Sequence, residues 1–92
     1  MATFVMLGRY SVEAIKGISS GRTQKATQAV EKAGGKIQAI YGLLGSRDLL
    51  IVADLPNAEA ALKASVALTQ LTGIAFSTSP AFPIEQFDKL LS

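Results

Sequence analysis

Few side chains in this chain are able to do chemistry, because it contains no histidine and no cysteine. Nucleophilic machinery of the Ser–His or Cys–His kind is therefore excluded, and so are the usual zinc and copper sites. We expect no metal and no cofactor. The remaining candidates carry hydroxyl, carboxylate or guanidinium groups, and we expect them to gather near one end of the assembled protein: Arg9, Tyr10, Tyr41, Arg47, Asp48, Ser77 and Thr78.

Tyr41 and Asp48 are the candidates for catalysis. Asp48 follows a glycine turn and begins a strand. Its carboxylate either accepts hydrogen bonds from local turn amides or acts as a general base, with its pKa raised by a buried environment. Tyr41 and Tyr10 each place a hydroxyl on an apolar strand. Each is either an ordinary tyrosine at the edge of the core or a donor that orients a ligand oxygen.

The other polar candidates also have a structural and a binding interpretation. Arg9 interrupts an apolar strand, so it must pair, extend its charge to water or face a subunit boundary. Arg47 either pairs with Asp48 or an anionic ligand, or it is a solvated charge of the hairpin. The segment from Ser19 to Arg22 either binds an anion through free amides and the guanidinium or caps the helix that follows.

Two further sets of polar residues have an ordinary structural role as their first interpretation. Thr78 lies in a serine- and threonine-rich strand, where such residues are common, and it is also a candidate for ligand binding. Asp54 and Glu59 flank the predicted start of a helix. Their carboxylates suit a hard metal ion, but carboxylates at this place more commonly complement the helix dipole, so we expect no metal there.

The elements that position these groups follow from apolar periodicity and turn residues. Two β-rich runs at 37–44 and 49–53, separated by Gly45–Asp48, predict a hairpin, which we expect at the centre of the sheet. Asn57 is the expected N-cap of a helix that ends at Gly73, and Gly34-Gly35 ends the helix before it. The remaining predictions are strands over 3–10 and 74–79, the latter ended by Pro80, and helices over 12–18 (broken at Gly17 and Ser19-Ser20-Gly21), 22–33, 58–72 and 84–91.

Alternation and helical spacing predict which side chains share a face. The first strand is expected to place Phe4, Met6, Gly8 and Tyr10 together, and the second strand to place Ile37, Ala39, Tyr41 and Leu43 together. The helix over 58–72 is expected to have its stripe at Leu62, Val66 and Thr69, with Ala61, Ala64, Leu68 and Leu71 beside it.

The predicted order, βαβ followed by βαβ, is that of an α+β, ferredoxin-like fold: a four-stranded antiparallel sheet with both helices on one face. We expect a single domain over residues 1–92. Both alternating sets of the central strands are largely apolar, as in Leu49-Leu50-Ile51-Val52. A sheet that is apolar on both faces is covered on both faces. We therefore expect a homodimer or higher oligomer, a dimeric α/β barrel, with the C-terminal helix over 83–92 packing on a partner subunit.

The composition agrees with self-association and argues against nucleic acid as a partner. Of the 92 residues, 49% are hydrophobic and 17% charged, which is apolar for so small a domain. The cations are dispersed, and the strand Leu49–Asp54 lacks the aromatic and basic residues of an RNA-recognition motif, so we expect no nucleic acid. We expect no membrane span and no signal peptide, and hence a cytoplasmic location.

Several stretches together resemble the GYD-domain family, over roughly residues 2–91: TFVMLGRYS, Ala-Gly-Gly before the second strand, YGLLGSRDLLIVADLP, KASVALTQLTGI and FSTSPAFP. The resemblance implies a dimeric α/β-barrel, ferredoxin-like fold in a family of largely unassigned function. The family is named for a Gly-Tyr-Asp signature at the hairpin. Here Gly45 and Asp48 match, and Arg47 stands in place of the tyrosine. The hairpin and the last strand also look like the small-molecule-binding domain of Lrp/AsnC-type regulators.

The functional hypothesis that follows is an oligomeric small-molecule-binding or assembly module, with an unidentified small molecule as its ligand. The alternative is a cofactor-free enzyme that acts on a small, mostly apolar substrate in the barrel cavity and uses Tyr41 or Asp48 for proton transfer. A third reading is a purely structural interaction protein. The enzyme hypothesis requires a roomy cavity with converging polar groups, whereas an open but chemically inert cavity favours a ligand sensor. A packed barrel interior leaves only the structural interaction protein.

Overall fold

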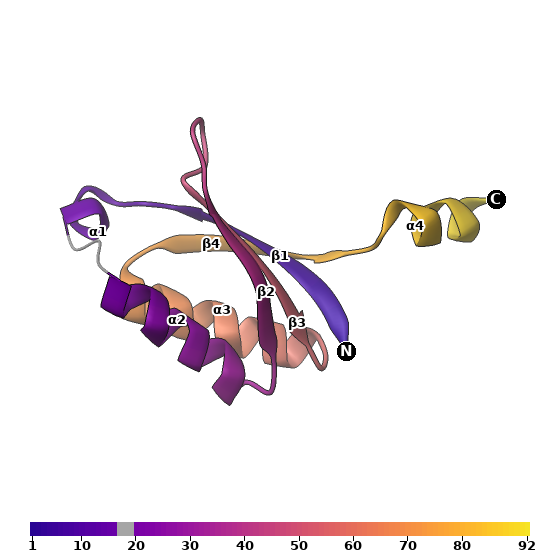
Figure 1. Ribbon diagram of the computed structural model, residues 1–92, viewed down its shortest axis with the longest axis horizontal. Helices are drawn as coiled ribbons and strands as arrows, with labels where there is room; N and C mark the ends of the chain where they lie inside the picture. Colours follow the sequence, from indigo (N-terminus) through magenta and orange to yellow (C-terminus); the bar gives the residue numbers. More distant parts are fainter. Residues whose placement is uncertain (17–19) are drawn as a thin grey trace.

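The computed structural model describes residues 1–16 and 20–92 and has the predicted βαββαβ order (Figure 1). Two short helices, α1 and α4, are added to that order. The fold is therefore α+β and ferredoxin-like, as predicted. The elements are β1 (Ala2–Arg9), α1 (Val12–Lys16), α2 (Ser20–Lys32), β2 (Lys36–Gly42), β3 (Leu49–Leu55), α3 (Ala58–Thr72), β4 (Ala75–Ala81) and α4 (Ile84–Leu91). The predicted end of the first short helix, with its break at Gly17 and Ser19, falls outside the described residues.

The strands form one antiparallel sheet in the order β2-β3-β1-β4. The β2–β3 hairpin therefore contributes one central strand and one edge strand, and the prediction that it forms the centre was wrong. The centre is β1 paired with β3, because the chain returns through the crossovers to place β1 between β3 and β4. Pro80 does not end β4, which continues to Ala81. An edge strand tolerates proline because its outer side needs no ladder donor.

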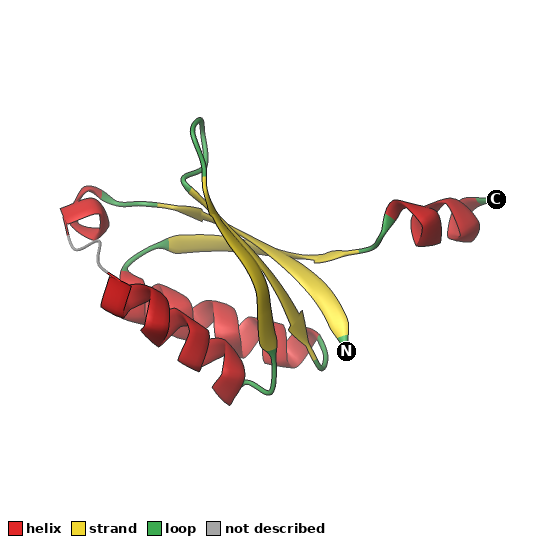
Figure 2. Cartoon of the chain, in the orientation of Figure 1, coloured by secondary structure: helices red, strands yellow, loops and turns green. Residues whose placement is uncertain are grey.

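Helices α2 and α3 cover one face of the sheet, and no other element of the described chain covers the opposite face, called here the open face (Figure 2). The covered face holds the core. Its largest fully buried side chains are Met6, Val30, Ile51, Leu55, Leu68 and Ile74. The burial of β1 alternates as predicted, with Phe4, Met6 and Gly8 facing the helices. The core therefore occupies one side of the sheet only.

A β-bulge in β2 changes the predicted faces of that strand. Ile37 lies opposite Ala53 and Ile40 opposite Ile51, so both share the covered side although they are three positions apart. Ala39 and Tyr41 pair with Val52 and Leu50 on the open face. Strict alternation, which grouped Ile37 with Ala39 and Tyr41, was wrong because the extra residue at Gln38 shifts the register by one.

The ends of the long helices agree with the predicted caps. The Asn57 side chain accepts a hydrogen bond from the amide of Ala60 at 2.9 Å, as an N-cap does. Gly73 ends α3 with φ of 71°, and Gly34 follows α2 with φ of 87°. Both values lie in the left-handed region that glycine adopts at least cost.

The buried stripe of α3 differs from the predicted one. Ala61, Ala64, Leu68 and Thr72 are buried, whereas Leu62 and Val66 are exposed and Thr69 lies on the solvent side. Both stripes of this alanine-rich helix are apolar, so spacing alone could not choose between them. The small residues Ala61 and Ala64 bring α3 close to the sheet, and Leu68 fills the space that remains.

Helix α4 has the predicted bounds and lies apart from the rest of the chain, at the far end of β4 (Figure 1). None of its eight residues is buried. Ile84, Phe87 and Leu91, predicted to share one side, are all exposed. Isolated helices shorter than about 12–15 residues are marginal in water, and the described residues bury none of the α4 side chains.

Candidate functional site

Asp48 joins the start of β3 to the end of β1. Its Oδ2 accepts a hydrogen bond from the amide of Tyr10 at 2.9 Å, and its own amide donates to the carbonyl of Gly8 at 2.9 Å. Its carbonyl accepts from the amide of Leu43 at 2.9 Å, which closes the hairpin. The carboxylate therefore accepts from a backbone amide, whereas the structural interpretation expected amides of the local turn. The amide belongs to a residue 38 positions away rather than to the local turn.

The other polar candidates at this end of the sheet lie at its surface. Tyr41 pairs with Leu50 on the open face and is 56% exposed. Arg9 is exposed at the end of β1, opposite Ala75, and Arg47 is exposed in the hairpin loop. The structure thus brings Arg9, Tyr41 and Asp48 to the same end of the sheet. Their roles as ligand-binding or catalytic groups stay predictions.

Tyr10 and Thr78 lie on the covered side and belong to a different environment. Thr78 sits opposite Met6, and its Oγ1 donates to Oγ of Ser65 in α3 at 3.0 Å. Ser77, beside it, is on the open face opposite Leu7. The predicted set is therefore divided between the two faces of the sheet.

A polar cluster that the sequence did not reveal lies at the opposite end of the open face. Oδ1 of Asp54 accepts from Oγ1 of Thr3 at 2.9 Å, and Oδ2 accepts from Nε2 of Gln38. These hydrogen bonds, that of Gln38 first and that of Thr3 second, lower the pKa of Asp54 below its ordinary value of 3.8. The feature that would have revealed this cluster is the cross-strand pairing of Thr3 with Asp54. That pairing is known only once the strand register is known.

The carboxylate of Asp54 therefore accepts hydrogen bonds from two protein side chains. In the described part of the chain, no group of three or more acidic side chains gathers as a metal site would require. Glu59 lies in the first turn of α3, where its charge complements the helix dipole, as expected.

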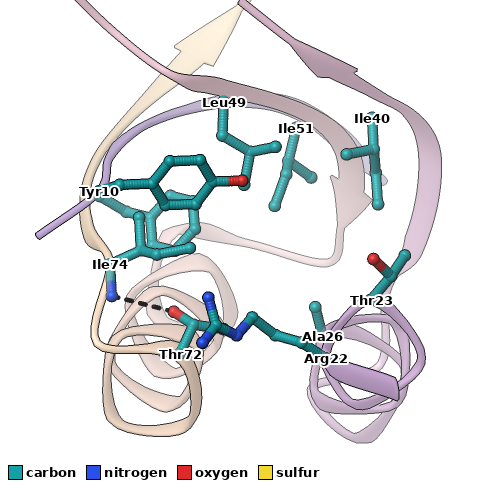
Figure 3. A pocket seen from close by; sticks show the side chains of 10 residues that line it. Tyr10, Arg22, Thr23, Ala26, Ile40, Leu49, Ile51, Thr72 and Ile74 are labelled. Atoms are coloured by element: carbon teal, nitrogen blue, oxygen red, sulfur yellow. Dashed lines mark hydrogen bonds between the residues drawn. The ribbon is translucent and has the colours of Figure 1, made fainter. Parts of the chain in front are cut away.

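A pocket opens on the covered side where α2 begins and α3 ends (Figure 3). Its volume is about 60 Å³. The apolar wall comes from α2, β2, β3, β4 and the residue just before β4. Its members are Ala26, Ile40, Leu49, Ile51, Ile74 and Phe76. The polar lining is Tyr10, Arg22, Thr23 and Thr72. Of these, only Tyr10 was in the predicted set. Arg22 was predicted only as part of the segment from Ser19 to Arg22, and Ser19 lies outside the described residues.

The wall of this pocket is closely packed where β1 meets the chain around β4. A Cβ atom added to Gly8 would lie 2.9 Å from Cγ2 of Ile74 and 2.9 Å from Cε1 of Phe76. Glycine at this position therefore lets both side chains lie directly against β1, and a larger residue would displace them.

The open face is apolar in its middle. Val5 and Leu7 of β1 lie beside Leu50 and Val52 of β3, and all are only half-buried. Large apolar side chains are also exposed outside the sheet, on α1, the outer side of α3 and the C-terminal segment: Val12, Ile15, Leu62, Val66, Leu71, Phe82, Ile84, Phe87, Leu90 and Leu91. This much exposed apolar surface indicates an interface.

No helix in the described part of the chain is both long and apolar enough to cross a bilayer.

The molecule is a ferredoxin-like α+β protein with one covered and one open sheet face. The sequence matches the model of the GYD domain over residues 4–91, nearly its whole length, so the protein belongs to the GYD-domain family. No curated protein matches the chain.

Proposed function

We propose that this protein is a cytoplasmic homo-oligomeric module that binds a small molecule, with the open face of the sheet as the contact between copies. The observation that carries the proposal is the row of half-buried apolar side chains Val5, Leu7, Leu50 and Val52 on a face that no element of the described chain covers. Burying them removes apolar area from water, which is the dominant favourable contribution to most protein–protein association.

A second copy of the same face is a suitable cover. A two-fold interface places the same patch on both subunits, so one apolar surface is enough to form it. The polar cluster at Asp54 lies at one end of the open face, outside its apolar middle, and Thr3 and Gln38 donate to its carboxylate. Packing of two such faces forms a dimeric α/β barrel.

Helix α4 is proposed to pack on the partner subunit. Its exposed apolar side chains include Ile84 and Phe87, and the helix stands well away from its own core (Figure 1). A short amphipathic helix gains stability mainly by burying its apolar side, so a partner surface would order it.

The alternative function is a cofactor-free enzyme. It is favoured by the placement of the Tyr41 hydroxyl and the Asp48 carboxylate at one end of the face that would line the barrel. Proton transfer would use one or both. Tyr41→Phe and Asp48→Asn should then abolish turnover, while Asp48→Asn keeps an oxygen able to accept from the amide of Tyr10. Turnover that survives both substitutions would eliminate this role.

Native mass spectrometry of the purified protein tests the assembly. We expect an even multiple of the subunit mass. Val52→Glu should release monomers, because it places a charge in the centre of the open face. Gln28→Glu on the outer side of α2 is the control and should leave the mass unchanged. A wild-type protein that is monomeric at micromolar concentration would disprove the proposal.

The contribution of α4 is measured in the same experiment. Phe87→Glu should weaken the assembly, whereas Gln86→Glu, the neighbouring exposed position, should not. Equal effects of the two variants would show that α4 does not pack through its apolar side.

A further inference from the structure

The pocket on the covered side has the composition of a binding site for a small amphiphile. Six of its lining residues are alanine, isoleucine, leucine or phenylalanine, and Ile51 and Ile74 are each only 1% exposed. Figure 3 shows the side chains of Arg22 and Thr72 across the pocket from Leu49 and Ile51. Tyr10 and Thr23 lie at its two sides. Apolar pockets with a small number of converging polar groups are the usual form of small-molecule sites.

The polar lining residues differ in what they can offer a ligand. The Thr72 hydroxyl is already committed, because it donates to the carbonyl of Leu68 at 2.6 Å and accepts from the amide of Ile74 at 3.1 Å. The backbone of Tyr10 is held by the bond from its amide to Asp48, which positions its ring over the pocket. Its hydroxyl makes no hydrogen bond to the described residues and is able to donate to a ligand.

The charge of the lining is positive. Arg22 extends from the first turns of α2 toward the Thr72 side of the pocket (Figure 3), and the described lining contains no carboxylate. A guanidinium has five N–H donors in a planar fork, so it binds a carboxylate geometrically well even while it makes a contact within the protein. The ligand that matches is an anion with an apolar body.

The size of the pocket limits that body. A volume of about 60 Å³ corresponds to roughly four to six water-sized groups, at about 10–15 Å³ each. Free phosphate would fit the charge but would leave the apolar wall formed by Ile40, Leu49 and Ile51 unmatched. A short hydrocarbon chain that ends in a carboxylate fits both.

We propose that this pocket binds a short aliphatic carboxylate, with the carboxylate between the Arg22 guanidinium and the Tyr10 hydroxyl and the hydrocarbon against Leu49 and Ile51. The inference deepens the proposed small-molecule-binding function, on which it rests, and places the ligand inside each subunit rather than in a cavity between subunits. Neither Tyr41 nor Arg47 lines the pocket.

The test is a titration of the full-length protein with butyrate, followed by amide chemical shifts in NMR spectra. We expect saturable shifts at Ala26, Ile51 and Ile74. Butanol and butylamine, of the same chain length, should bind at least about tenfold more weakly, since a charge-assisted hydrogen bond is worth more than a neutral one. Inorganic phosphate should give no saturable shifts at these positions. Equal binding of butylamine, or saturable binding of phosphate, would overturn the assignment.

Matched substitutions locate the site. Arg22→Gln and Tyr10→Phe should each weaken butyrate binding by about tenfold or more, because both groups donate to an ionised carboxylate. Arg47→Gln and Tyr41→Phe remove the same groups from the hairpin loop and the open face, and they should leave the affinity unchanged. If both pairs behave alike, or if Arg22→Gln has no effect, the pocket is not the site.

Native mass spectrometry of the same samples separates this inference from the proposed assembly. An oligomer whose pocket resonances do not respond to butyrate would overturn the carboxylate assignment alone. A monomer that binds butyrate in the Arg22-dependent manner would overturn the assembly and leave the pocket in place.

Discussion

Ile51 and Val52 are neighbours on β3 and point to opposite faces of the sheet. Ile51 is 1% exposed beneath α2 and α3, whereas Val52 is only half-buried and has no covering element in the described chain. The two residue types are almost equally apolar. The contrast shows that the hydrophobic pattern of this chain specifies more buried surface than its own helices supply, and that the excess lies on one face.

The same contrast appears within α3. Leu68 is fully buried against the sheet, and Leu62, less than two turns earlier, is 66% exposed. The apolar residues of this protein therefore form two groups: those buried in the core of the subunit, and those that are exposed and available for contact. Measurements that separate these groups would sharpen or break the proposed assembly.

The largest expected effect concerns the two neighbours on β3. Ile51→Ala should reduce the free energy of unfolding by about 2–5 kcal/mol, because it leaves a cavity in the covered core. Val52→Ala should cost little in an isolated subunit. In an assembled protein its cost should depend on protein concentration, since the lost contact lies between copies.

Chemical denaturation of both variants at several protein concentrations checks this prediction. A loss at Val52 that is small and independent of concentration would mean that the open face stays in water. A small loss at Ile51 would contradict the core assigned here.

An effect of intermediate size on the free energy of unfolding is expected at the N-cap of α3, the helix that packs on the covered face. Asn57→Ala removes the acceptor for the amide of Ala60 and should lower the free energy of unfolding by about 1 kcal/mol. Ser46→Ala in the exposed hairpin loop serves as the control and should change it by less than about 0.5 kcal/mol. Thermal denaturation is sufficient to compare them, and equal melting temperatures would mean that the cap contributes nothing.

The smallest effect is a pH dependence on the open face. The pKa of Asp54 is lower in the folded protein than in the unfolded chain, so the folded state holds the proton less readily. Its contribution to stability is then present above the ordinary pKa of 3.8 and is lost as the pH falls through the lowered value.

Asp54→Asn should therefore flatten the stability profile below about pH 4, and Gln38→Ala should reduce its slope, because Gln38 is the first cause of the shift. Glu85→Gln on exposed α4 is the control. Denaturation curves between pH 2 and 6 provide the measurement. Identical profiles for wild-type and Asp54→Asn would show that the Thr3 and Gln38 hydrogen bonds do not hold the carboxylate charged.

Much of the fold was predictable because it is encoded in local signals. Asn57 and Gly73 mark the ends of α3, and alternation in β1 places Phe4, Met6 and Gly8 on one face, which the structure shows to be the buried one. The bounds of α3 and α4 also agree with their periodicity and flanking residues. Each of these features depends on backbone conformations or side-chain spacings a few residues long, which the sequence states directly.

The candidate site was less predictable because its groups meet only through long-range pairing. The bond between Asp48 and the amide of Tyr10 joins residues 38 positions apart, and Asp54 meets Thr3 across 51 positions. The bulge at Gln38 moves Ile40 to the side of Ile37 and supplies the second donor to Asp54. Sheet register and bulges therefore decided which polar groups meet and which remain apart.

The amino-acid order by itself determined the order of helices and strands, their caps, and the presence of apolar residues on both faces of the sheet. Only the tertiary structure decided that α3 buries Leu68 rather than Leu62, that Tyr10 and Tyr41 lie on opposite sides, and that Arg22 lines a pocket with Ile51. The physical reason is that burial depends on which equally apolar surfaces fit together in space, and periodicity along the chain cannot rank them.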